Sequence, residues 1–215
     1  MMATMGTRES FESVWSPYLA IAIVIAVLVI GTIAFAVIRY RDRGDSTPRD
    51  RPTWLARAEV VWLVAIAAVI AVTLTLTFRA QDDISALGSD QPAATVDVTA
   101  FQWGWRFDYG DGAVVIGNGQ RIPTLVVPTG ELIRFNLISR DVIHSFWIPE
   151  ERFKRDAFPD RESQFGLVFD DSPSEGRCAE FCGLDHYRMD FHVLPVSPAA
   201  FDSWLARNRA SGAAT

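Results

Sequence analysis

A stretch of twelve residues concentrates side chains that bind soft metal ions. It runs from Cys178 to Met189 and places two thiols, one imidazole and one thioether at the spacing C-x3-C-x3-H-x2-M. Thiolate, imidazole and thioether ligands favour copper over hard cations such as magnesium and calcium. The donors are Cys178, Cys182, His186 and Met189, and together they predict a copper site.

A second imidazole must come from another part of the chain. A single-copper electron-transfer site uses two His, one Cys and a weak axial Met, and here a second Cys is present. The chain has three His, and His144 lies upstream in the sequence Asp-Val-Ile-His-Ser-Phe-Trp. Two thiolates can bridge two metal ions, each of which is then completed by one His. The residues therefore indicate a binuclear copper site.

Two other interpretations of the cysteine pair stay open. Two Cys in an exported domain could form a disulfide, and they could also share a structural zinc ion with His186. The His and the Met that follow the cysteines, together with Glu180 between them, favour copper.

Residues 1–79 contain two apolar segments long enough to cross a membrane. Residues 18–38 are 21 residues without a charge, about 31 Å as a helix, and residues 60–78 are 19 residues without a charge. The first could instead be a cleaved signal peptide, although the apolar region of such peptides is usually shorter. The Arg-rich segment between them predicts a cytoplasmic loop. We therefore expect a two-pass hairpin in the cell membrane, with both termini on the periplasmic or extracellular side.

The rest of the chain is acidic and has the periodicity of β-strands. Residues 80–215 carry twelve Lys/Arg against twenty Asp/Glu, a net charge of −8, which suits a basic partner and does not suit nucleic acid. Residues 80–94 have the composition of a polar linker. Alternating apolar residues begin at Thr95, so that residues 95–215 are expected to form the exported domain.

Short strands separated by Pro/Gly turns recur through this domain. They are expected from Thr95 to a turn at 108–112, and at 113–116, 122–127, 131–139, 143–148, 164–169 and 189–196. Many short strands of this kind predict a β-sandwich or barrel. Ser197 and Pro198 then begin a short C-terminal helix.

The motif C-x-E-x-C-x3-H-x2-M, with D-V-x-H-S-F upstream, resembles subunit II of haem–copper cytochrome c oxidases, and the resemblance covers nearly the whole chain. It implies a cupredoxin-like Greek-key β-barrel that carries a binuclear copper centre (CuA). It also implies a subunit that accepts electrons from cytochrome c and passes them to subunit I, where oxygen is reduced. The implied metal ligands are His144, Cys178, Glu180 through its carbonyl group, Cys182, His186 and Met189.

The resemblance implies roles for three more groups, each with a plainer alternative. The Glu180 side chain would reach a magnesium ion at the boundary with subunit I, or it only caps the loop. Trp103, in the element Q-W-x-W, would receive the electron from cytochrome c, or it lines the core with Trp105. Glu59, in E-x-x-W, would take up protons toward subunit I, or it is an interfacial charge. The family usually has an aromatic residue where Gly104 stands.

Other functions fit parts of the pattern. A membrane-anchored copper carrier would need exchangeable ligands, often in Met or His clusters, and three of the four Met lie in the first five residues. A quinol oxidase subunit would keep the fold without copper, which the intact Cys pair argues against. Nitrous oxide reductase carries a similar motif but has a large catalytic domain. We expect no cytochrome c domain within these residues, because they contain no C-x-x-C-H haem site.

Overall fold

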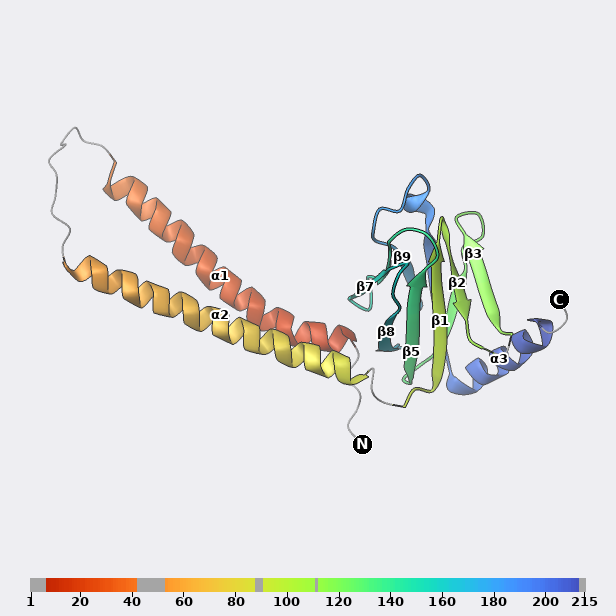
Figure 1. Cartoon of the computed structure of the whole chain (residues 1–215). Helices are drawn as coiled ribbons and strands as arrows, with labels where there is room; N and C mark the ends of the chain where they lie inside the picture. The colour runs from red at the N-terminus through yellow and green to blue at the C-terminus, as the bar shows by residue number, and fades with distance from the viewer. Residues whose placement is uncertain (1–6, 42–52, 88–90, 111, 213–215) are drawn as a thin grey trace. The chain divides into compact units, whose positions relative to one another are not determined.

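A computed structural model describes residues 7–41, 53–87, 91–110 and 112–212. The chain divides into two compact units (Figure 1), each of which is described by itself. The first, the helical unit, is Glu12–Gln81, and the second, the β unit, comprises Met1–Phe11 and Asp82–Thr215.

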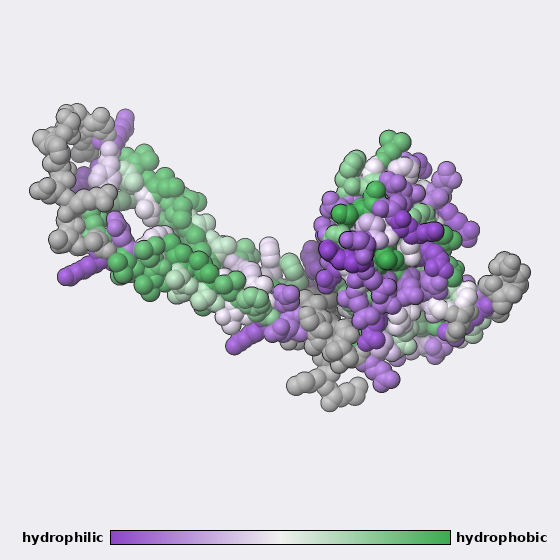
Figure 2. All heavy atoms as spheres, viewed as in Figure 1, coloured by the Kyte–Doolittle hydropathy of each residue, from purple (hydrophilic) through white to green (hydrophobic). Residues whose placement is uncertain are grey.

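Two long helices form the hairpin. They are α1 (Thr7–Arg39) and α2 (Thr53–Leu87), and each contains a window long and apolar enough to cross a membrane. Figure 2 shows hydrophobic residues along both helices. Side chains such as Ile30 and Val61 are 67% and 68% exposed, a surface that suits lipid or a partner helix and not water.

The polar groups inside the hairpin find partners within it. The Tyr18 hydroxyl of α1 donates to the Thr73 carbonyl oxygen of α2 at 2.7 Å and contacts the Thr77 hydroxyl. The hydroxyls of Thr73, Thr75 and Thr77 donate to backbone carbonyls of the preceding helical turn. Such pairing is what an apolar environment requires.

Helix α2 is longer than the predicted span. It continues through Arg79 to Leu87, so it includes the first eight residues of the predicted linker 80–94. This stretch holds no Gly or Pro before Gly88, and several of its residues are good helix formers. Most of the predicted cytoplasmic loop, at residues 42–52, lies outside the described residues.

The β unit contains two five-stranded sheets and a C-terminal helix. In the first sheet the strands are β3 (Val114–Asn118), β2 (Gly104–Asp108), β1 (Ala94–Phe101), β5 (Leu132–Ser139) and β8 (Ser163–Val168), in this order. In the second they are β4 (Thr124–Pro128), β10 (Asp190–Val196), β9 (Ser174–Cys178), β6 (His144–Ile148) and β7 (Phe153–Ala157). The β1–β5 and β4–β10 pairs are parallel, and the other pairs are antiparallel. Helix α3 (Pro198–Gly212) follows.

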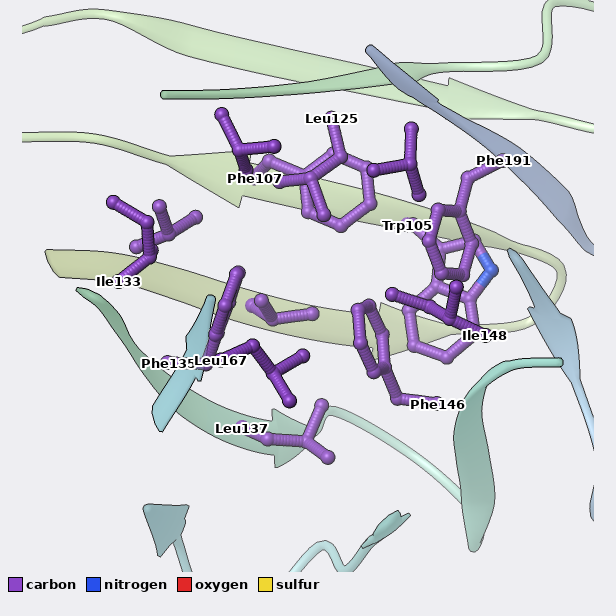
Figure 3. Close-up of a cluster of buried hydrophobic side chains, with 14 of the residues drawn as sticks. Trp105, Phe107, Leu125, Ile133, Phe135, Leu137, Phe146, Ile148, Leu167 and Phe191 are labelled. Atoms are coloured by element: carbon purple, nitrogen blue, oxygen red, sulfur yellow. The ribbon is translucent and has the colours of Figure 1, made fainter. Parts of the chain in front are cut away.

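The core lies between the inner faces of the sheets (Figure 3). Alternate residues point inward along β5, where Ile133, Phe135 and Leu137 are fully buried. Each such side chain contributes about 1.5–3 kcal/mol relative to remaining exposed. The predicted fold class is confirmed: an N-terminal helical hairpin, an all-β domain and a short C-terminal helix.

The segment expected to be one strand from Thr95 is a hairpin of two. Strands β1 and β2 pair so that Phe101 lies opposite Gly104, and Gln102 and Trp103 form the turn. A Cβ atom on Gly104 would lie 2.2 Å from the Gly117 carbonyl oxygen on β3. The close approach of β2 to β3 therefore needs glycine at this position.

Strands β7 and β9 were not expected from the sequence. Their sequences, Phe-Lys-Arg-Asp-Ala and Ser-Glu-Gly-Arg-Cys, are polar and carry little alternation. Strand β9 is held between β6 and β10 by pairing on both edges. Tertiary pairing here outweighs local strand preference.

Candidate metal centre

Neighbouring strands bring the two halves of the predicted ligand set together. His144 begins β6, Cys178 ends β9, and these strands pair with Phe146 opposite Cys178. The loop after β9 returns through a short 3-10 helix, η1 (His186–Arg188), to β10. The backbone N–H of Ala179 donates to the Ser145 carbonyl at 3.0 Å, which ties the loop to β6.

The sulfur and nitrogen donors form one cluster. The sulfur atoms of Cys178 and Cys182 are 3.9 Å apart. Cys178 Sγ lies 3.8 Å from His144 Nδ1, and Cys182 Sγ lies 3.5 Å from His186 Nδ1. Each thiol therefore faces one imidazole, an arrangement that suits two thiolates shared between two ions.

Two weaker donors complete the cluster. The Met189 Sδ atom is 3.8 Å from Cys182 Sγ, and the Glu180 carbonyl oxygen is 3.2 Å from Cys178 Sγ. The structure thus brings all six predicted donor groups to one place. Among the described residues, the ligand atoms of His144, Cys178 and Cys182 all lie within 4.8 Å of one another, close enough to hold a metal ion.

The distances also bear on the two alternatives. Both cysteines are free, and their sulfur separation is about twice a disulfide bond length. A structural zinc ion takes four ligands, which two Cys and two His would satisfy. The thioether and the carbonyl oxygen would then have no role, so the donor set fits copper better than zinc.

The site is largely shielded from water. His144, Cys178, Cys182 and Met189 are 0%, 6%, 3% and 1% exposed. His186 is half-buried, and Glu180 is exposed. Ligands held in a packed interior keep their positions when the charge of a bound ion changes.

The two thiols differ in acidity. Burial would raise the pKa of Cys178, but hydrogen bonds with His144 and with the loop backbone outweigh burial and lower the pKa to about 7. Burial raises the pKa of Cys182, and the neighbouring Cys178 thiolate raises it further. The Cys178 thiol is therefore the more readily ionised of the two. The Cys182 thiol loses its proton most easily when a metal ion binds its sulfur.

Asp141 orients one of the imidazoles, a role that the sequence interpretation missed. Its Oδ1 atom accepts a hydrogen bond from His144 Nε2 at 2.8 Å, which leaves Nδ1 facing Cys178. Its Oδ2 atom accepts from the backbone N–H of Gln102 at 2.8 Å. Burial would raise the Asp141 pKa, but these partners and the Val142 N–H lower it. The signal was the i, i+3 spacing of Asp141 and His144, because metal-binding His residues commonly donate to a carboxylate.

Trp103 lies against the metal-binding loop. Its indole N–H donates to the Cys182 carbonyl oxygen at 3.1 Å, and Gln102 Nε2 donates to the same oxygen at 2.7 Å. Trp105 and Phe107 are fully buried, whereas Trp103 sits in the turn and is half-buried. Trp103 lies in the turn and not on the strand of Trp105, but its side chain still packs against the buried core.

Glu59 is not part of this cluster. It lies on α2, in the helical unit, and its side chain is exposed.

The metal-binding loop between β9 and β10 also carries three exposed apolar side chains that the sequence interpretation did not single out. Phe181, Leu184 and Tyr187 are 79%, 83% and 73% exposed.

Comparisons with known proteins show which family the chain belongs to. Residues 119–196, a range that contains all six donor groups, match the family model of the cytochrome c oxidase subunit II periplasmic domain. The probable cytochrome c oxidase subunit 2 of Nocardia farcinica (strain IFM 10152) is 30% identical over 266 residues, covering 93% of this chain and 71% of that protein. The cytochrome c oxidase subunit 2 of Bacillus sp. (strain PS3) is 37% identical over 164 residues, covering 70% of this chain but only 45% of that protein.

A solved structure shows the same fold in the β unit. The crystal structure of the periplasmic domain of subunit II of cytochrome oxidase (CoxB) of Bradyrhizobium japonicum matches with a TM-score of 0.51 and 27% identity, covering 57% of this chain and 98% of that chain. The β unit is therefore cupredoxin-like, and the two apolar helices make it a membrane-anchored domain. This chain belongs to the family of cytochrome c oxidase subunit II.

Proposed function

We propose that this chain is the electron-accepting subunit of a haem–copper oxidase. A binuclear copper centre would take electrons from cytochrome c and pass them to subunit I, where oxygen is reduced. The observation that carries the proposal is the pair of cysteine sulfurs 3.9 Å apart, each within 3.8 Å of an imidazole nitrogen. The ligands would be His144, Cys178, the Glu180 carbonyl group, Cys182, His186 and Met189.

Several features of the site favour relay of electrons over catalysis. When bound, copper supplies one-electron redox chemistry. The chain supplies all six donor groups itself, so the site is built without a position for substrate. The strands hold His144 and Cys178 from two sides, and burial excludes water, so the ligands rearrange little during electron transfer.

The surface around the loop suits protein partners. Exposed Phe181, Leu184 and Tyr187 offer apolar contact area beside the site. The net charge of −8 over residues 80–215 favours a basic cytochrome c as donor.

The remaining proposals concern subunit I and the membrane. Glu180, whose side chain is exposed, would reach a magnesium ion shared with subunit I. The Arg-rich loop of the hairpin would lie in the cytoplasm, with both termini and the β unit on the other side.

Oxidation of reduced cytochrome c by the copper-loaded chain tests the proposal. In stopped-flow mixing, the full chain in detergent should oxidise a basic cytochrome c rapidly at low salt. The rate should fall as ionic strength approaches 0.15 M, where the Debye length is about 8 Å. The copper-free chain is the control and should oxidise none. Equal rates with and without copper, or no electron transfer to the loaded chain, would contradict the proposal.

Glu59 is proposed as a proton-uptake residue on the cytoplasmic side. Glu59→Gln removes the ionisable group and keeps its size, so turnover of the assembled oxidase should slow while copper content stays the same. The measurement is oxygen consumption at saturating electron donor, alongside a metal analysis. Unchanged turnover would leave Glu59 as an interfacial charge only.

A further inference from the structure

The carbonyl oxygen of Met189 joins three segments around the candidate metal centre. It accepts a hydrogen bond from the backbone N–H of Cys178 at 3.0 Å. It also accepts one from the indole N–H of Trp105 on β2, with an Nε1–O distance of 3.2 Å. The proposed ligand residues Cys178 and Met189 are therefore joined by a backbone hydrogen bond. The Trp105 side chain, from the other sheet, donates to the same carbonyl oxygen.

Trp105 is firmly held in the core. It is 0% exposed, and the rings of Phe146 and Phe191 meet it edge-on, with centroid distances of 5.7 and 5.4 Å. Figure 3 shows these three rings packed together at one end of the core. The imidazole of His144 lies 6.4 Å away at 59°. Trp105 thus contacts one proposed ligand residue by a hydrogen bond and a second by its ring.

We propose that Trp105 is a positioning residue that sets the place of the Met189 thioether. The Met side chain is unbranched and flexible, so its sulfur can be placed only if its backbone is fixed. A buried indole N–H needs an acceptor, and here that acceptor is the Met189 carbonyl. The inference rests on the proposed copper function.

The expected consequence is a change in reduction potential. Axial donors tune the potential of copper–thiolate sites. A thioether that donates electron density stabilises the oxidised state more than the reduced state. If the Met189 backbone loosens, its sulfur becomes a weaker donor and the potential should rise.

Trp105→Phe is the direct test, because it keeps an aromatic ring and removes the donor. In the full chain, purified in detergent and loaded with copper, we expect two copper ions as in the wild type. The reduction potential should shift upward, the electron paramagnetic hyperfine splitting should change, and a chelator should remove copper severalfold faster. Trp204→Phe is the matched control: Trp204 packs on Tyr109 and Phe201, with centroids 4.8 and 6.1 Å apart. It should lower the melting temperature and leave the potential unchanged.

Gly119→Ala disturbs Arg188, the residue before Met189, from outside the core. A Cβ at this position would lie 2.8 Å from Arg188 Cβ and 3.0 Å from the Arg188 carbonyl oxygen, one residue before Met189. This variant leaves Trp105 intact, so it tests the idea even if Trp105→Phe fails to fold. It should also shift the potential. The inference would be overturned if a variant that folds and binds two copper ions kept the reduction potential and the paramagnetic spectrum of the wild type.

A copper-free measurement separates this inference from the proposed function. In the apo chain the indole N–H of Trp105 should exchange with solvent far more slowly than that of half-buried Trp147. Rapid exchange would contradict the hydrogen bond from Trp105 to the Met189 carbonyl oxygen, whatever the chain binds. Wild-type chain that takes up no copper would instead contradict the proposed function while leaving this hydrogen bond in place.

Discussion

At the scale of single residues, the Cys182 carbonyl links the metal cluster to the surface. It accepts hydrogen bonds from Gln102 Nε2 at 2.7 Å and from Trp103 Nε1 at 3.1 Å. The space for these contacts depends on Gly183, which has a φ of +119° and whose added Cβ would lie 3.2 Å from both side chains. Trp103 is half-buried, so it joins a ligand residue to the protein surface. We propose that an electron from a docked donor enters the site through this connection.

Trp103→Phe should slow electron transfer within the complex severalfold, because the ring loses its hydrogen bond to Cys182. Copper content and the salt dependence of binding should stay the same. The measurement is flash-initiated electron transfer beside a melting curve, with Trp147→Phe as a control for replacing another half-buried Trp. A core Trp would instead lose stability, by about 1–3 kcal/mol. A lowered melting temperature with an unchanged transfer rate would return Trp103 to a structural role.

The motif predicted which candidate donor groups lie together, but it did not predict what surrounds them. Five of the six donor groups lie on one loop at fixed spacing, so the motif already placed them together. The position of Trp103 could not be predicted, since Phe101, Trp103 and Trp105 alternate as in one strand while the chain turns between them. Nothing local to Asp141 indicated that it would also bind the Gln102 N–H from a distant turn.

At the scale of elements, β9 is positioned by a glycine contact that its sequence does not reveal. A Cβ on Gly176 would lie 1.9 Å from the Phe191 ring of β10. Phe191 in turn stacks on Phe146 of β6, with centroids 4.8 Å apart. The strand that ends in Cys178 therefore fits only because residue 176 has no side chain, and this explains why a polar segment forms an inner strand.

Gly176→Ala should lower the free energy of unfolding by about 1–3 kcal/mol, the usual cost of overpacking. Chemical denaturation of the full chain would measure it. Adding Phe191→Leu should restore part of the loss, because the smaller side chain frees the space. An alanine variant as stable as the wild type would show that the contact is not tight.

At the scale of the whole molecule, two units with different surfaces share one chain. The helical unit exposes apolar side chains along its length (Figure 2), and residues 80–215 carry a net charge of −8. Composition alone predicted a helical part and a β part, because a spanning helix and a β-domain differ in hydrophobic content and in periodicity, but it did not predict the bounds of the two units. The end of α2 could not be placed from composition, since residues 80–87 are polar yet helical.

The most direct test of the account is the number of copper ions in the full chain and how they share an electron. We expect two copper ions per chain and a paramagnetic spectrum in which one unpaired electron is spread over two copper nuclei. Cys182→Ser should leave at most one copper ion. His192→Ala, which changes an exposed His on β10 outside the cluster, should keep both. A single tightly bound copper ion in the wild type, or a preference for zinc, would contradict the binuclear centre.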